Sequence, residues 1–88
     1  SRFPYGHEIT SERLKMVEKA EEYLKEGGLS EVRVRCQGST ARIEIPKNEL
    51  KHFFNKYDFD ELVKYFSQLG FNCTSLDLEG LISGKLNR

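Results

Sequence analysis

Apolar residues recur every three or four positions along residues 9–26, which is the spacing of one buried stripe on a helix. Thr10 is a good N-cap at the start of this segment, and Gly27-Gly28 follows its last apolar position. The pattern therefore predicts a helix over 9–26. Its buried stripe consists of Leu14, Val17, Ala20 and Leu24.

The pattern changes to strict alternation in residues 31–36 and 41–45, which predicts two strands. The connection between them contains a glycine and favours a β-hairpin. Whether the loop is GS or QGST, the register pairs Cys36 with Ala41, places Arg35 opposite Arg42, and places Arg33 opposite Glu44. The face expected to be buried carries Val32, Val34, Cys36, Ala41, Ile43 and Ile45.

Helical spacing returns after Pro46. Residues 47–54 predict a short helix with Leu50, Phe53 and Phe54 inward. Asp58 with Glu61 forms a capping box that begins a longer helix, and Gly70 ends it. The core stripe of that helix comprises Leu62, Val63, Phe66 and Leu69. Residues 71–79 alternate again and predict a third strand with Thr74, Leu76 and Leu78 inward.

The main elements follow the order α-β-β-α-β, which predicts a two-layer α/β (α+β) sandwich. A right-handed crossover joins the second strand to the third, and we expect it to place the third strand beside the first, in the order 2-1-3. The helices would then cover one face of a three-stranded sheet and leave the other face open. The 88 residues provide for one domain with one core.

The amino-acid composition disfavours several classes of function. Lys and Arg number 14, as do Asp and Glu, so the formal net charge is zero and a strong nonspecific nucleic-acid binder is disfavoured. No apolar run approaches the ~18 residues of a membrane span, and we expect a cytoplasmic protein without membrane contact. Cys36 and Cys73 are expected to be buried, reduced thiols; with His7 and His52 they lack the spacing of a metal site.

The open face carries the most informative charges. Arg35 opposite Arg42 is a like-charge pair that costs about 0.2–1 kcal/mol unless an anion lies between them, whereas Arg33 opposite Glu44 is favourable. One interpretation is a solvated face of mixed charge. The other is a polar site in which Arg33, Arg35 and Arg42 hold phosphate or carboxylate through their planar donor groups. Glu44 would support these arginines, as would Asp77 and Glu79 of the third strand. No catalytic residue and no metal ligand are predicted.

Three strings can be considered together: SRFPYG at the start, VRVRCQGSTARIEIP in the hairpin, and LDLEGLISGKLNR at the end. They resemble the C-terminal part of the PP-loop ATP pyrophosphatases of the sacrificial sulfur transferase type. Proteins of that type mature the nickel-pincer cofactor of lactate racemase. The resemblance extends from Ser1 to Asn87, and the LDLEG string is its most specific part.

The resemblance implies that ATP chemistry and substrate contact belong to different domains. In that family an N-terminal domain holds the ATP loop and adenylylates the substrate carboxylate, so ATP and Mg belong to that part and this chain needs no cofactor. Residues 1–88 would be a C-terminal accessory domain, inactive alone, with residues 1–8 as the hinge from a missing ATP-binding domain. Arg33 and Arg35 would contact an anionic group of a small-molecule substrate, with Glu44 supporting them.

Two other functions remain as alternatives. One is a stand-alone module that binds RNA or a protein through the sheet. Neutral charge and few outward aromatic side chains count against RNA. The other is self-association through the open face, which would make the protein a homo-oligomer.

Overall fold

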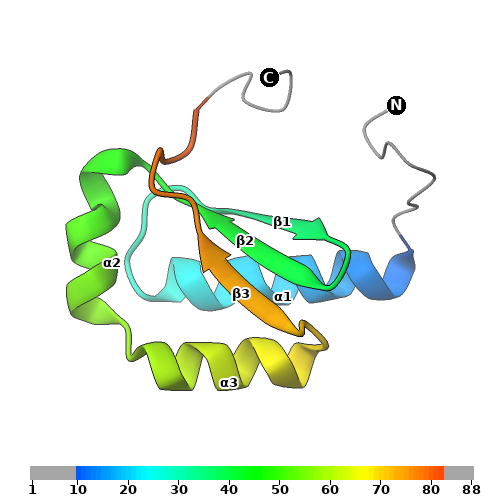
Figure 1. Cartoon of the computed structure of the whole chain (residues 1–88). Coiled ribbons are helices and arrows are strands. Elements are labelled where there is room, and N and C mark those ends of the chain that lie inside the picture. The colour runs from blue at the N-terminus through cyan, green and yellow to red at the C-terminus, as the bar shows by residue number, and fades with distance from the viewer. Residues whose placement is uncertain (1–9, 83–88) are drawn as a thin grey trace.

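Three helices and one three-stranded mixed sheet make up the computed structural model, which describes residues 10–82 (Figure 1). This compact α+β arrangement confirms the predicted fold class. In chain order the elements are α1 (Ser11–Glu26), β1 (Arg33–Gln37), β2 (Thr40–Glu44), the 3-10 turn η2 (Lys47–Glu49), α2 (Leu50–Lys56), α3 (Phe59–Leu69) and β3 (Cys73–Leu76).

The helix caps predicted from the sequence are confirmed. Thr10 Oγ1 accepts the Arg13 amide at 3.0 Å and begins α1. Asp58 Oδ1 accepts the amides of Asp60 and Glu61 at 2.9 and 3.2 Å and begins α3. These bonds satisfy amides that have no partner inside the helix.

The β-hairpin has the predicted register. Cys36 pairs with Ala41, Arg35 with Arg42, and Arg33 with Glu44. Gly38 adopts a φ of 60° in the tight connection, a conformation that glycine reaches without steric cost.

The predicted strand order 2-1-3 is wrong. The order is β1-β2-β3, with β1 and β2 antiparallel and β3 parallel to β2. The handedness rule constrains the crossover from β2 to β3, but it does not fix the side of β2 that β1 occupies. On the outer edge of β1 the Val34 amide donates to Glu21 Oε2 of α1 at 2.9 Å, so a side chain takes the place of a strand there.

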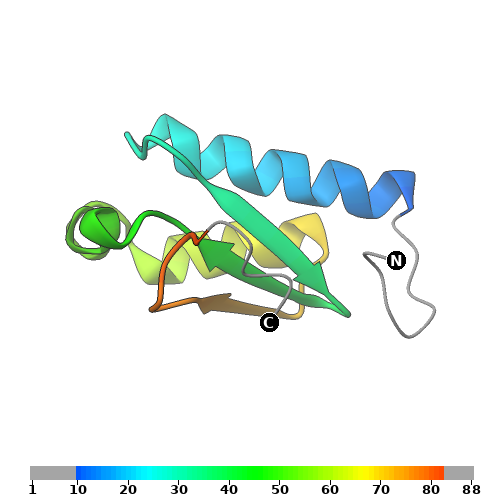
Figure 2. The ribbon, with the colours of Figure 1, turned by 90° about the horizontal axis from the view of Figure 1, so that it is seen from above.

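Helices α1 and α3 lie on one face of the sheet, as predicted, whereas α2 lies beyond the ends of the strands (Figure 1 and Figure 2). The core fills the space between the sheet and the helices. Ala20, Leu24, Ile45 and Phe66 have no exposed surface. The core residues that surround them are Leu29, Val32, Val34, Ala41, Ile43, Phe53, Leu62 and Phe71.

Besides Cys73, four residues predicted to be buried are exposed instead. The start of α1 extends beyond the hairpin turn (Figure 2), and Leu14, in this first part of the helix, is 47 % exposed. Leu78 follows the end of β3 and points away from the core, with 65 % of its surface exposed. Phe54 and Val63 border the core stripes of α2 and α3, and each is about half exposed.

The two cysteines are free thiols. Cys36 is half-buried on β1, whereas Cys73 is exposed on β3, which corrects the expectation that both are buried. The alternation of each strand directs them to opposite faces of the sheet, with β2 between them, so they are too far apart for a disulfide.

Side chains of the η2–α2 region hold the end of α1. The Tyr57 hydroxyl donates to the Leu24 carbonyl, and His52 Nε2 lies 3.0 Å from the Gly27 carbonyl. The Ser30 hydroxyl and amide donate to the two Glu49 oxygens at 2.6 and 3.1 Å, and these bonds lower the pKa of the Glu49 carboxyl. The loop that leads into β1 is thereby fixed.

Candidate anion-binding site

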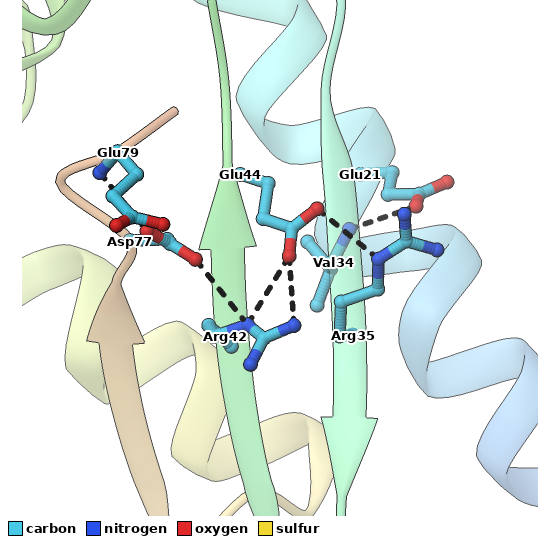
Figure 3. A network of polar contacts seen from close by, with 7 residues as sticks. All are labelled: Glu21, Val34, Arg35, Arg42, Glu44, Asp77 and Glu79. Carbon is cyan, nitrogen blue, oxygen red and sulfur yellow. Dashed lines mark hydrogen bonds and ion pairs between the residues drawn. The ribbon is translucent and has the colours of Figure 1, made fainter. Parts of the chain in front are cut away.

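A buried carboxylate occupies the open face of the sheet. Glu44 ends β2 on the face away from the helices, yet its side chain has 0 % exposure, and two arginines bind it (Figure 3). Arg35 Nε lies 3.2 Å from Oε1 of Glu44. Arg42 Nε and Nη2 lie 3.2 and 2.8 Å from Oε2.

This pairing explains how a charged group can be buried in so small a domain. Removing a carboxylate from water is unfavourable unless charged donors replace the lost hydration. Arg35 binds one oxygen of Glu44 and Arg42 binds the other, so both oxygens have donors. No buried side-chain oxygen or nitrogen in residues 10–82 lacks a hydrogen-bond partner.

The geometry corrects the expected pairing of the arginines. Arg33 lies opposite Glu44 in the register, but the ion pairs of Glu44 are with Arg35 and Arg42. Arg35 is the diagonal neighbour of Glu44 across the strands, and long side chains reach that distance. The Glu44 carboxylate therefore compensates the repulsion expected between Arg35 and Arg42.

The two supporting acidic residues, Asp77 and Glu79, have different roles. Asp77 Oδ2 lies 3.9 Å from Arg42 Nε, so Asp77 joins the site (Figure 3). Glu79 is exposed, and its amide donates to Asp77 Oδ1 at 3.0 Å. The backbone of Glu79 therefore holds Asp77 in place.

Beyond β3, the chain turns back onto β2. The Leu81 amide donates to the Ile45 carbonyl at 2.8 Å, and Gly80 lies against Lys47 with a φ of 88°. This contact places the end of the LDLEG string beside the strand that carries Glu44.

The outward donors of the site belong to Arg33 and Arg35. Arg33 is exposed on β1, and it forms no hydrogen bond or ion pair with any described residue. Arg35 uses Nε for Glu44, and no bond to the described residues engages its two Nη groups. The bond to Glu44 fixes the plane of the Arg35 guanidinium in advance, and such a planar donor suits a carboxylate or phosphate.

Glu21 is a contributor that sequence reasoning missed. It accepts the Val34 amide and fixes the strand that carries Arg33 and Arg35 (Figure 3). The sequence does contain a signal for this role: Glu21 lies within the apolar stripe, between Val17 and Leu24. A carboxylate at such a position needs a partner inside the protein.

The described residues offer neither a membrane-spanning helix nor a metal site. No helix in the range 10–82 is long and apolar enough to cross a membrane. Within the same range, no group of three or more His, Cys, Asp or Glu side chains is arranged to hold a metal ion.

Comparison with known proteins gives similarity along nearly the whole chain. An uncharacterized protein of Synechocystis is 50 % identical over all 88 residues. The pyridinium-3,5-bisthiocarboxylic acid mononucleotide synthase of Lactiplantibacillus plantarum is 40 % identical over 99 % of this chain. An uncharacterized protein of Methanocaldococcus jannaschii is 34 % identical over 90 %. No family model matches.

The matches cover most of this chain but only part of each relative. This chain spans 33 %, 31 % and 30 % of these three relatives. The similarity to the synthase therefore concerns one third of that enzyme.

Proposed function

We propose that this chain is the substrate-side domain of a larger ATP-using enzyme of the PP-loop sulfur transferase type. The similarity to the synthase supports this function, because the name of that enzyme describes a product with thiocarboxylic acid groups and a mononucleotide. Such a molecule carries a phosphate and sulfur at its carboxyl groups. The arginines of the open face are donors suited to either kind of anion.

The observation that carries the proposal is the Glu44 pairing. Glu44 binds Nε of both Arg35 and Arg42 and so fixes the planes of the two guanidinium groups. An arginine oriented in advance loses less side-chain entropy when it binds a ligand. Arg33 and the Nη groups of Arg35 would contact the anionic group, while Asp77 limits the rotation of Arg42.

The remainder of the enzyme would supply the chemistry. The ATP loop and its Mg would lie in the N-terminal domain, and this chain would provide substrate contacts and assembly. Mixed with ATP and Mg, the pure 88-residue chain should release no pyrophosphate. Measurable turnover would contradict the proposed role.

Anion binding can be tested on the chain alone by thermal unfolding. A ligand of the folded state stabilises it by RT ln(1 + [L]/Kd), so phosphate at about ten times Kd adds ~1.4 kcal/mol. Chloride at matched ionic strength controls for screening. Arg33→Gln should abolish the phosphate effect without disturbing Glu44.

Lys64→Gln, at an exposed position of α3, is the matched control and should keep the phosphate effect. Equal protection of wild type and Arg33→Gln would show that Arg33 is only a solvated surface charge. Phosphate protection that Lys64→Gln also removes would indicate nonspecific screening.

A further inference from the structure

Glu21 reaches from α1 to the point of β1 that lies between the two outward-facing arginines. Its Oε2 accepts the Val34 amide at 2.9 Å, and Val34 separates Arg33 from Arg35 in the strand (Figure 3). Amides along an antiparallel strand point alternately to its two sides. The Val34 amide therefore points away from β2, and Glu21 meets it at the outer edge of the sheet.

The part of α1 that carries Glu21 is fixed by the core. Ala20 precedes Glu21 and Leu24 follows it by nearly one turn, and neither has exposed surface. The Val34 side chain, with 3 % exposure, belongs to the same core. A carboxylate that accepts an amide proton also makes a stronger bond than a neutral acceptor does. Glu21 is thus a short link between a fixed helical turn and the edge strand.

Arg33 depends on this link more than Arg35 does. The Arg35 side chain is held separately, because its Nε donates to Glu44 Oε1. Arg33 is exposed and forms no hydrogen bond or ion pair with any described residue, so the backbone of β1 determines where its guanidinium can lie. An edge strand has a partner strand on one side, and it opens locally more readily than the centre of a sheet. The bond to Glu21 restrains that opening at the residue next to Arg33.

We propose that Glu21 is a positioning residue of the anion site: by holding the Val34 amide, it keeps Arg33 and Arg35 in the arrangement that binds an anion. This inference rests on the proposed function, because it concerns the same site. Glu21 can affect binding in two ways that have opposite signs. Its negative charge repels an anion, so removing the charge alone would strengthen binding. Its bond to Val34 positions the arginines, so removing the bond weakens binding.

Titration of the 88-residue chain with inorganic phosphate, followed by NMR at room temperature and constant ionic strength, measures the dissociation constant of each variant. Glu21→Ala removes the acceptor and should raise the phosphate dissociation constant by about threefold to tenfold. Glu21→Gln removes the charge but keeps an oxygen acceptor, and it should stay within about twofold of wild type. Equal or tighter binding by Glu21→Ala would overturn the inference, as would a Glu21→Gln variant as weak as Glu21→Ala.

Two control variants separate positioning from stability. Glu22→Ala makes the same substitution at the exposed neighbouring position of α1. Asp58→Ala removes the N-cap of α3 and lowers the melting temperature from a different helix. Both should keep the wild-type dissociation constant, and thermal unfolding verifies that each variant is folded at the temperature of the titration. If Asp58→Ala weakens phosphate binding as much as Glu21→Ala does, the loss reflects stability and the inference is wrong.

Hydrogen exchange tests the Val34 bond without any ligand. Relative to the other amides of the sheet, the Val34 amide should exchange slowly in wild type and Glu22→Ala, and about tenfold faster or more in Glu21→Ala. Equal exchange of this amide in wild type and Glu21→Ala would overturn the inference, whatever the titrations give.

The titrations also distinguish this inference from the proposed function. If the wild type binds no phosphate, the proposed function and the inference are both wrong. If Arg33→Gln removes phosphate binding that Glu21→Ala keeps, the anion site stands and the inference alone is wrong.

Discussion

Arg42 and Glu44 lie two positions apart on β2, and Arg42 donates two of the three hydrogen bonds that the buried Glu44 carboxylate accepts from residues in the range 10–82. Residues at this spacing share a face of the sheet. The pair therefore forms within one strand, while Arg35 adds the contact across the hairpin. We expect the stability of the domain and the orientation of both arginines to depend on this carboxylate.

Glu44→Gln should destabilise the domain. Glutamine keeps the size of the side chain but presents an amide donor to guanidinium donors, so charge-assisted bonds at 2.8 and 3.2 Å are lost. The free energy of unfolding in urea should fall by about 1.5–3 kcal/mol. Glu26→Gln, at an exposed position at the end of α1, should change it by less than about 0.5 kcal/mol. Equal effects would mean that the Glu44 bonds contribute nothing specific.

Arg42→Gln should lower the free energy of unfolding more than Arg33→Gln does. Direct cross-strand pairing, in which Arg33 binds Glu44, would give the opposite order. Arg42→Gln removes two bonds to a buried carboxylate and should cost about 1.5–3 kcal/mol. Arg33 is exposed and outside the ion pairs of Glu44, so Arg33→Gln should cost less than about 0.5 kcal/mol. Urea unfolding of both variants at one salt concentration decides between the two pairings.

The sequence was sufficient to predict the hairpin, because the alternation of apolar and polar residues and the turn at Gly38 determine its register. It did not reveal the partners of Glu44, since a long side chain can reach the opposite, diagonal or same-strand arginine equally well. The strand order was not determined by the sequence pattern, because the crossover rule does not fix the side of β2 on which β1 pairs. The exposure of Leu14 and Leu78 likewise depends on where neighbouring elements end, which periodicity does not show.

Tyr57→Phe should weaken the attachment of α2 to α1. The Tyr57 hydroxyl donates to the Leu24 carbonyl, and its loss should cost about 0.5–1.5 kcal/mol near neutral pH. Burial raises the pKa of Tyr57 above its ordinary value of 10.0, with a smaller contribution from Tyr23. The unfolded chain therefore ionises first.

The stabilisation from this raised pKa is complete below pH 10.0 and is lost as the pH rises through the folded value. The free energy of unfolding of wild type should then fall more steeply in alkali than that of Tyr57→Phe. Circular dichroism during urea titration at a series of pH values measures both slopes. Parallel slopes would show that Tyr57 ionises alike in the two states.

Gly80→Ala should loosen the segment that follows β3. Gly80 has a φ of 88°, and an added Cβ would lie 3.0 Å from the Lys47 amide nitrogen and 3.1 Å from the Ile45 carbonyl oxygen. Conformational strain and this contact together should cost about 1–3 kcal/mol. Gly38 also has positive φ, but an added Cβ there meets nothing within 4 Å. Gly38→Ala should therefore be the milder change in thermal unfolding, and the reverse order would show that the Gly80 contact can relax.

The bond between Glu21 and Val34 bears on solubility. An edge strand offers its amides to strands of other molecules, and such pairing is a route to aggregation. Glu21 occupies the Val34 amide and places a carboxylate where an incoming strand would lie. Glu21→Ala should leave much of the core packing in place but expose this edge. Concentrated solutions of that variant would then scatter light within hours under conditions in which the parent stays clear, and two equally clear solutions would show that the edge needs no such protection.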